Sequence, residues 1–148
     1  MFRFVHAADL HLDSAFGALT PQQAAARRRE SREMPFRLAN YVNTHGIDLV
    51  LLAGDLLDGH GAFRKTGEQL AQALGQMEAQ VCIAPGNHDF LGGGSVWEAV
   101  DWPETVHIFR EPRMTALELP ELCAVVHGAA FTAPEQAESL LAGFAALA

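Results

Sequence analysis

Short apolar runs alternate with longer amphipathic segments in the first half of the chain, and this pattern predicts strands that alternate with helices. Strands are expected at residues 2–7, 47–53 and 81–84, and the second is a near-continuous apolar run typical of a central parallel strand. Helices are expected from about residue 20 to 45 and over residues 65–78. Strand–helix–strand units with crossovers of this length predict an α/β fold with a parallel sheet core flanked by helices.

The first predicted helix carries clear boundary signals. Thr20 is a suitable cap, Pro21 occupies the first helical position, and Gly46 is a suitable C-terminal stop. Pro35 lies inside the pattern and predicts a kink or two consecutive helices. The apolar stripe that faces the core is expected to comprise Met34, Leu38, Tyr41, Val42 and His45.

The second half of the chain contains shorter elements. After three consecutive glycines we expect a short helix at residues 95–100 and strands at 106–109, 114–119 and 122–126. The alanine-rich tail, residues 133–148, is expected to be helical. Because no linker or repeat interrupts the pattern, we expect one domain over residues 1–148.

The composition is that of an ordinary globular protein, with 49% hydrophobic and 19% charged residues. No apolar run approaches the roughly 20 residues of a membrane span, and the N-terminal residues lack the layout of a signal peptide. We therefore expect a cytoplasmic protein without a membrane partner. Cys82 and Cys123 lie in apolar runs, and we expect both to be small buried hydrophobic residues, as fits a reducing compartment.

The charge distribution is uneven. The net charge of −8 gives no long-range attraction for nucleic acid, but five of the ten basic residues fall within residues 27–37. Arginine suits forked contacts with phosphate, whereas a charge run alone is more often a solvated helix face. Contact with phosphate or nucleic acid is the hypothesis for Arg27, Arg28, Arg29 and Arg32.

Polar side chains follow each of the first three predicted strands, at the point where the strand ends. Because ligands gather at the carboxyl ends of parallel strands, we expect these side chains to share one site. Each motif alone is more often a turn or a helix cap than a functional site, but three in succession favour function. The residues are Asp9 and His11, Asp55 and Asp58, and Asn87, His88 and Asp89. Among the other histidines only His127 is kept, as a weaker candidate.

The donor set indicates a metal-dependent chemistry. Carboxylates, an amide oxygen and an imidazole suit Mn²⁺, Fe²⁺ or Zn²⁺ better than a soft metal. Two neighbouring cations need a bridging carboxylate, and Asp55, on the middle motif, is placed for that role. Gly54 and Gly86 are expected to let the backbone turn sharply. His88 is a candidate proton donor oriented by Asp89.

Four stretches together resemble the calcineurin-like metallophosphoesterase superfamily. They are HAADLHLDSAFGALT, GDLLD, GNHD and VVHGAAF, and the resemblance covers residues 2 to about 131. The first stretch is similar to the DNA repair exonuclease branch, which includes the SbcCD nuclease subunit and YhaO-like relatives.

The resemblance implies a role for each residue of the three motifs. Asp9 and His11 would bind the first metal and Asn87 the second, with Asp55 between them. His88 would assist the leaving group, steered by Asp89, and Asp58 would support the ligands from outside. The resemblance also implies two divalent ions, usually Mn²⁺, DNA as the substrate, an SbcC-like ATPase partner with a long coiled coil, and a homodimer.

The sequence departs from the family pattern after residue 131. The family continues with a further ligand histidine and a Gly-His-x-His motif, whereas no histidine follows His127 here. We therefore expect an N-terminal portion of a longer enzyme. The first metal would keep three ligands and the second two, so these 148 residues alone are expected to bind metal weakly and to have little or no activity.

Three functions remain open from the sequence. The leading hypothesis is a two-metal phosphodiesterase of the DNA exonuclease type. The acidic balance favours instead a phosphodiesterase or phosphatase acting on a small molecule or a protein. The missing histidines favour a non-catalytic interaction module with the same fold.

Overall fold

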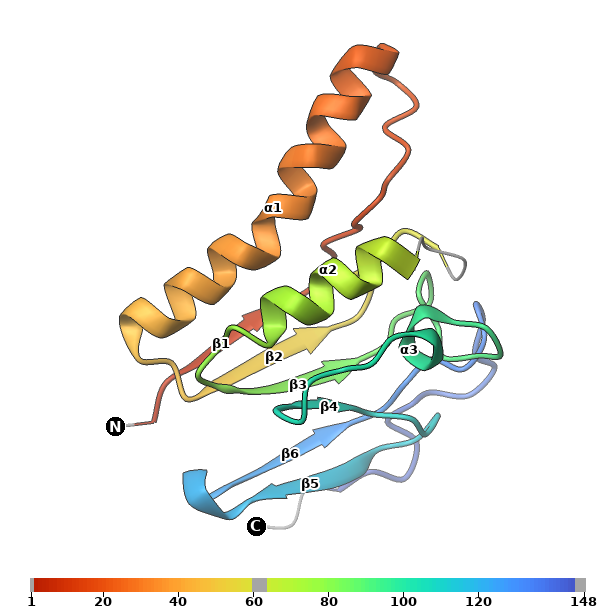
Figure 1. Ribbon diagram of the computed structural model, residues 1–148. Helices are drawn as coiled ribbons and strands as arrows, with labels where there is room; N and C mark the ends of the chain where they lie inside the picture. Colours follow the sequence, from red (N-terminus) through yellow and green to blue (C-terminus); the bar gives the residue numbers. More distant parts are fainter. Residues whose placement is uncertain (1, 60–63, 146–148) are drawn as a thin grey trace.

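The centre of the molecule is a four-stranded parallel sheet with the order β1-β2-β3-β4 (Figure 1). The computed structural model describes residues 2–59 and 64–145. The register pairs Ala7 with Leu52 and Ala53 with Ala84, so the first three strands end at one edge of the sheet. The predicted α/β fold with a parallel sheet is confirmed. The strands are β1 (Phe4–Ala7), β2 (Leu49–Ala53), β3 (Gln80–Ala84) and β4 (Val106–Ile108).

The two faces of this sheet have different covers. The helices lie on one face, as right-handed crossovers between successive neighbouring strands require (Figure 1). An antiparallel hairpin packs on the other face, where Leu117 and Val126 contact the cluster around Phe109. The helices are α1 (Pro21–His45), α2 (Arg64–Leu74) and α3 (Val96–Ala99), and the hairpin strands are β5 (Thr115–Leu119) and β6 (Ala124–Gly128).

Helix α1 begins and ends where the sequence predicts. Thr20 accepts a hydrogen bond from the Gln23 N–H, the Gln23 side chain accepts one from the Thr20 N–H, and Gly46 caps the end at φ 58°. Pro35 lies within one continuous helix, not between two helices, and the axis changes direction along its length (Figure 1). Within the described ranges, no helix is both long enough and apolar enough to cross a membrane.

The buried stripe of α1 differs from the predicted one by a rotation of about one residue. Val42 is fully buried and Leu38 is partly buried against the core, as expected, but Met34, Tyr41 and His45 are exposed. The small residues Pro35 and Ala39 are buried instead. Both stripes have helical spacing, so spacing alone does not distinguish between them.

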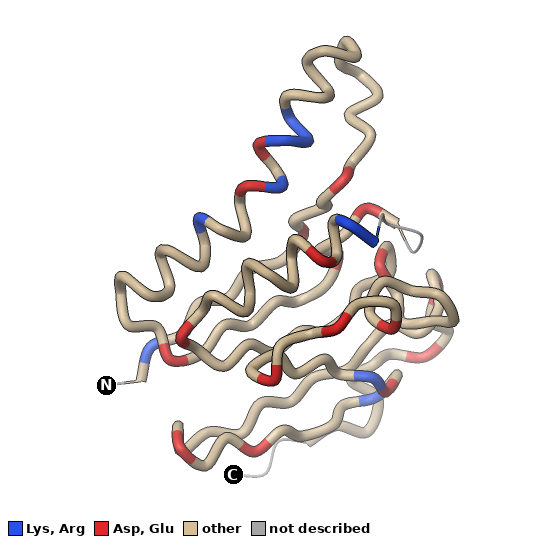
Figure 2. Tube along the Cα trace, viewed as in Figure 1, with Lys and Arg blue, Asp and Glu red and all other residues tan. Residues whose placement is uncertain are grey.

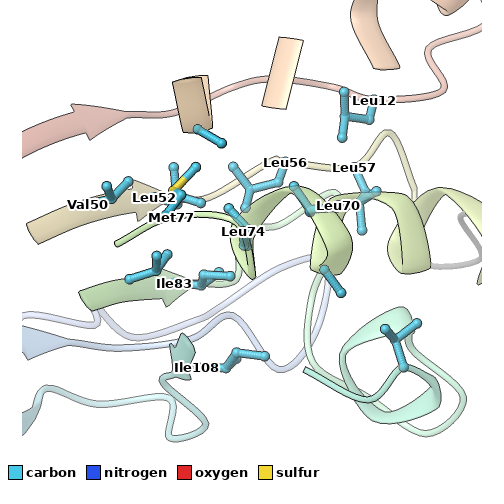
Figure 3. Packing of buried hydrophobic residues seen from close by; sticks show 14 of the residues in the cluster. Leu12, Val50, Leu52, Leu56, Leu57, Leu70, Leu74, Met77, Ile83 and Ile108 are labelled. Atoms are coloured by element: carbon cyan, nitrogen blue, oxygen red, sulfur yellow. The ribbon is translucent and has the colours of Figure 1, made fainter. Parts of the chain in front are cut away.

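The main core extends beneath the loops that follow the strands. Leu12, Leu56 and Leu57 are at most 1% exposed and join the cluster of Val50, Leu70 and other side chains between sheet and helices (Figure 3). Leu12 also forms a parallel bridge with Leu57. The loops that carry the polar motifs are therefore anchored by the apolar residues within them.

Two cysteines predicted to be alike have different surroundings. Cys82 lies in β3 and is buried, and burial raises the pKa of its thiol to about 11. Cys123 is exposed, in a turn with φ 49°, because the chain forms a 3₁₀ turn at Pro120–Leu122 and β6 begins only at Ala124. The prediction of a buried Cys123 in a strand over 122–126 is wrong.

The predicted helical tail is also wrong for the residues described. Residues 133–145 form bends and turns, and residues 146–148 lie outside the described ranges. Gly143 adopts φ 70°, and the Phe144 ring lies 5.0 Å from His127 of β6. Helix propensity is only a weak preference, and the high alanine content does not make this segment helical. Helix α2 likewise ends at Leu74, earlier than predicted.

Candidate metal site at the strand ends

The loop after β1 runs beside the loop after β2 and is held there by backbone hydrogen bonds. The N–H of Asp9 donates to Gly54 at 3.1 Å, and the N–H of His11 donates to the carbonyl of Asp55 at 2.9 Å. Parallel pairing thus continues past the ends of the strands. The first two motifs are brought together in this way, as the sequence predicts.

The expected ligands of the first metal share an uncommon backbone conformation. Asp9, His11 and Asp55 have φ values of 57°, 42° and 52°, in the left-handed region. Residues other than glycine rarely adopt this conformation, and such strain tends to concentrate at functional sites. Asp13, Phe16 and Cys123 share this conformation outside the group, so the backbone supports a functional site only in combination with the donor atoms.

Donor atoms of these three side chains lie within 4.8 Å of one another. The Nε2 atom of His11 is 3.8 Å from a carboxylate oxygen of Asp9. Two carboxylates and an imidazole at this separation form a group that could hold a divalent cation.

Asp55 connects all three motifs. Its backbone carbonyl accepts from His11, and its carboxylate accepts from the His88 N–H at 2.9 Å. Gly54 turns the chain at φ 82°, as expected. Gly86 is needed for a different reason, because a Cβ there would lie 2.2 Å from the Asp55 carboxylate. Close approach, not a sharp turn, therefore requires glycine at position 86.

Asn87, the expected ligand of a second metal, is exposed beside Asp55. Both line a cavity of about 240 Å³, whose wall also includes Phe131 and Leu140. An amide oxygen and a carboxylate therefore border one open space.

Asp89 has a different role from the one predicted. It is 1% exposed, and its carboxylate accepts from the N–H groups of Gly86 at 2.7 Å, Leu56 at 2.8 Å and Leu57 at 3.2 Å. Burial raises the pKa of this carboxyl, and the three donors, which favour the ionised form, oppose the rise. The expectation that Asp89 orients the His88 ring is corrected, because its oxygens are engaged by the backbone.

The carboxylate that faces His88 is that of Asp58. One oxygen of Asp58 lies 3.4 Å from Nδ1 of His88 and 3.3 Å from Nδ1 of His11. The two imidazole rings meet edge to face, with centroids 5.0 Å apart. Asp58 thus lies between a predicted ligand and the predicted proton donor.

Asp13 is a buried charge that sequence reasoning missed. Its side chain is 4% exposed and binds the guanidinium of Arg32 and the hydroxyl of Thr66, which links the first loop to α1 and α2. A single aspartate in Leu-Asp-Ser carries no signal of burial, because its partners are distant in sequence. Arg32 is consequently neutralised by a protein carboxylate.

The remaining candidates do not belong to the two groups of side chains, among the described residues, that could hold a metal ion. His127 belongs to the hairpin strand β6. Arg27 pairs with Glu30 at 2.6 Å, and Arg28 donates to the carbonyl of Ala15. Arg28 and Arg29 line a cavity of about 490 Å³ between α1 and α2.

Comparison with known proteins agrees with this geometry. The model of the calcineurin-like phosphoesterase family matches residues 2–136. A Bacillus subtilis (strain 168) protein named as an uncharacterized metallophosphoesterase, YhaO, is 42% identical over 115 residues, which cover 72% of this chain and 27% of the relative. The chain thus spans about a quarter of the length of the curated relative it matches.

We predict that Asp89→Asn lowers the free energy of unfolding by about 1–3 kcal/mol, because an amide group would face a backbone donor that it cannot satisfy. Urea denaturation followed by fluorescence of Trp97, which is buried and donates to the Asp89 carbonyl, measures the change. The exposed Asp101→Asn is the matched control. Equal stability of the two variants would contradict a structural role for Asp89.

Proposed function

Since the chain belongs to the calcineurin-like phosphoesterase family, we propose that its strand-end site hydrolyses phosphodiester bonds with the help of divalent cations. The observation that carries this proposal is the meeting of Asp9, His11 and Asp55 within 4.8 Å. Their left-handed backbone adds support, because strain of this kind is retained where function requires it.

The donor chemistry fits such cations. Asp9, His11 and Asp55 offer oxygen and imidazole nitrogen, and we propose Mn²⁺ as the first cation. Asp55 and Asn87, which border the same cavity, would hold the second. Bound there, the cations would offset charge on the phosphate oxygens and lower the pKa of an attacking water.

His88 is our candidate for proton transfer to the leaving oxygen. Its side chain is 49% exposed, so a substrate can reach it. Asp58 faces Nδ1, which leaves Nε2 as the nitrogen available for the transfer. Asp89 acts through the backbone, since it fixes the loop on which His88 lies.

DNA is the substrate that we propose, as in the SbcCD-like exonuclease branch. The N-terminal half of α1 projects beyond the sheet and carries four of the five arginines of this helix (Figures 1 and 2). Arg27, Arg32 and Arg37 pair with carboxylates, so Arg28 and Arg29 are the better candidates for phosphate contact. Their cavity also contains Gln69, a further polar group.

Activity, substrate and partners of the whole protein remain proposals, because the chain spans only part of its relative. The coiled-coil ATPase partner and the homodimer stay predictions. A small phosphodiester is the alternative substrate. Binding of duplex DNA that weakens steeply with salt would favour DNA over a small phosphodiester.

We predict Mn²⁺ binding and slow hydrolysis of bis-p-nitrophenyl phosphate that both depend on Asp55. Asp55→Ala should abolish both, because this carboxylate serves both proposed cations. His88→Gln should keep Mn²⁺ binding and lower kcat by about 100-fold or more. Electron paramagnetic resonance of free Mn²⁺ and release of nitrophenolate measure the two effects. Hydrolysis that survives Asp55→Ala, or Mn²⁺ binding that Asp55→Ala leaves unchanged, would contradict the proposal.

We predict that binding of duplex DNA weakens steeply with salt and depends on Arg28 and Arg29. The double variant Arg28→Gln/Arg29→Gln should reduce the slope of log affinity against log salt by about 2, since each lost phosphate contact contributes about 0.9. Fluorescence anisotropy with Mn²⁺ present measures the slope. Arg27→Gln/Arg37→Gln removes the same charge from residues paired with Glu30 and Glu33 and is the control. Equal slopes for the two double variants would count against this surface.

A further inference from the structure

The imidazole of His11 presents its two nitrogens to two different groups of donors. Nε2 lies 3.8 Å from Asp9, in the group completed by Asp55. Nδ1 lies 3.3 Å from Asp58, in a second group completed by His88. The ligand atoms of the second group also lie within 4.8 Å of one another. His11 is thus common to two possible metal positions.

The two groups differ in ligand chemistry. The first has two carboxylates and one imidazole, a set that suits harder cations such as Mn²⁺. The second has two imidazoles and one carboxylate, a set that suits Zn²⁺, which commonly binds three protein ligands and a water. The protein therefore offers two positions around one histidine, and each position suits a different kind of cation.

The spacing of the second group fits zinc. Ligands about 2.0–2.1 Å from a tetrahedral ion lie roughly 3.3–3.4 Å apart. The Asp58 oxygen is 3.3 Å from one Nδ1 atom and 3.4 Å from the other. An N–H···O hydrogen bond is usually shorter, about 2.9–3.0 Å. The two contacts are therefore at the long end of hydrogen-bond distances, and they match two edges of a zinc tetrahedron.

We propose that His11, Asp58 and His88 form a zinc site that competes with the first cation of the strand-end site. A neutral imidazole binds a metal through one nitrogen, because binding through both would require loss of its remaining proton. Occupation of one position therefore disfavours the other. The side chains are 26–49% exposed, which leaves the site open to exchange with solvent.

The expected consequence is inhibition by zinc, a step that rests on the proposed function. A metal bound to Nδ1 of His88 fixes the ring and removes it from proton transfer. Asp58 faces the same nitrogen and would bind the metal too, so it would no longer orient the His88 ring. Excess Mn²⁺ should reverse the inhibition, because it draws His11 back to the first position.

Binding of each metal to the 148-residue chain tests the site without reference to activity. Cys123→Ser is included in every protein to remove the exposed thiol. Asp9→Asn should weaken Mn²⁺ binding by about 100-fold or more while Zn²⁺ affinity stays within about twofold, and His88→Gln should do the reverse. Calorimetry measures Zn²⁺ and electron paramagnetic resonance measures Mn²⁺. His107→Gln, an exposed imidazole on β4, should change neither.

Zinc affinity that falls in Asp9→Asn and is unchanged in His88→Gln would overturn the proposal, because Zn²⁺ would then occupy the first position only. Asp58→Asn gives a second test, since it removes a direct ligand of Zn²⁺ but only an outer support of the Mn²⁺ ligand His11, and so should weaken Zn²⁺ binding more than Mn²⁺ binding. Zinc should also lower Mn²⁺-dependent hydrolysis, and excess Mn²⁺ should restore it. Hydrolysis that persists in Asp55→Ala would contradict the proposed function, whereas the binding results decide the zinc site independently of any activity.

Discussion

The buried carboxylate of Asp89 is the contact on which the strand-end geometry depends. It accepts from backbone N–H groups of Leu56, Leu57 and Gly86, and so joins the loops after β2 and β3 beyond the point where their pairing ends. Trp97 of α3 donates to the carbonyl of the same residue and links this junction to the helical layer. A charge with three directed donors holds a more defined geometry than apolar packing alone, because hydrogen bonds fix angles as well as distances.

The sheet and the meeting of the motifs could be predicted from the sequence, because both follow from local rules. Apolar runs of strand length marked β2 and β3, and the caps at Thr20 and Gly46 gave the ends of α1. Parallel strands in sequential order then bring their carboxyl ends to one edge without any knowledge of tertiary contacts. The proximity of Asp9 and Asp55 is a consequence of topology.

The partners of individual charges could not be predicted, because they depend on distances between segments remote in sequence. Adjacency suggested Asp89 as the partner of His88, whereas Asp58 from another loop faces that ring. Asp13 reaches Thr66 in α2, a pairing that no local pattern encodes. The predictions for the tail and for Cys123 failed for a related reason. Alanine content and apolar runs indicate a preference for helix or strand, but not the surface against which a segment can pack.

The sequential order of the strands has a consequence for how the molecule is built during synthesis. Each new strand can add to the edge left by the previous one, so no segment must wait for a distant partner. Asp9, His11 and Asp55 are together once two strands have paired. His88 arrives only with the third. A nascent chain therefore brings together the three side chains proposed to bind a cation before it gains the residue proposed to use one.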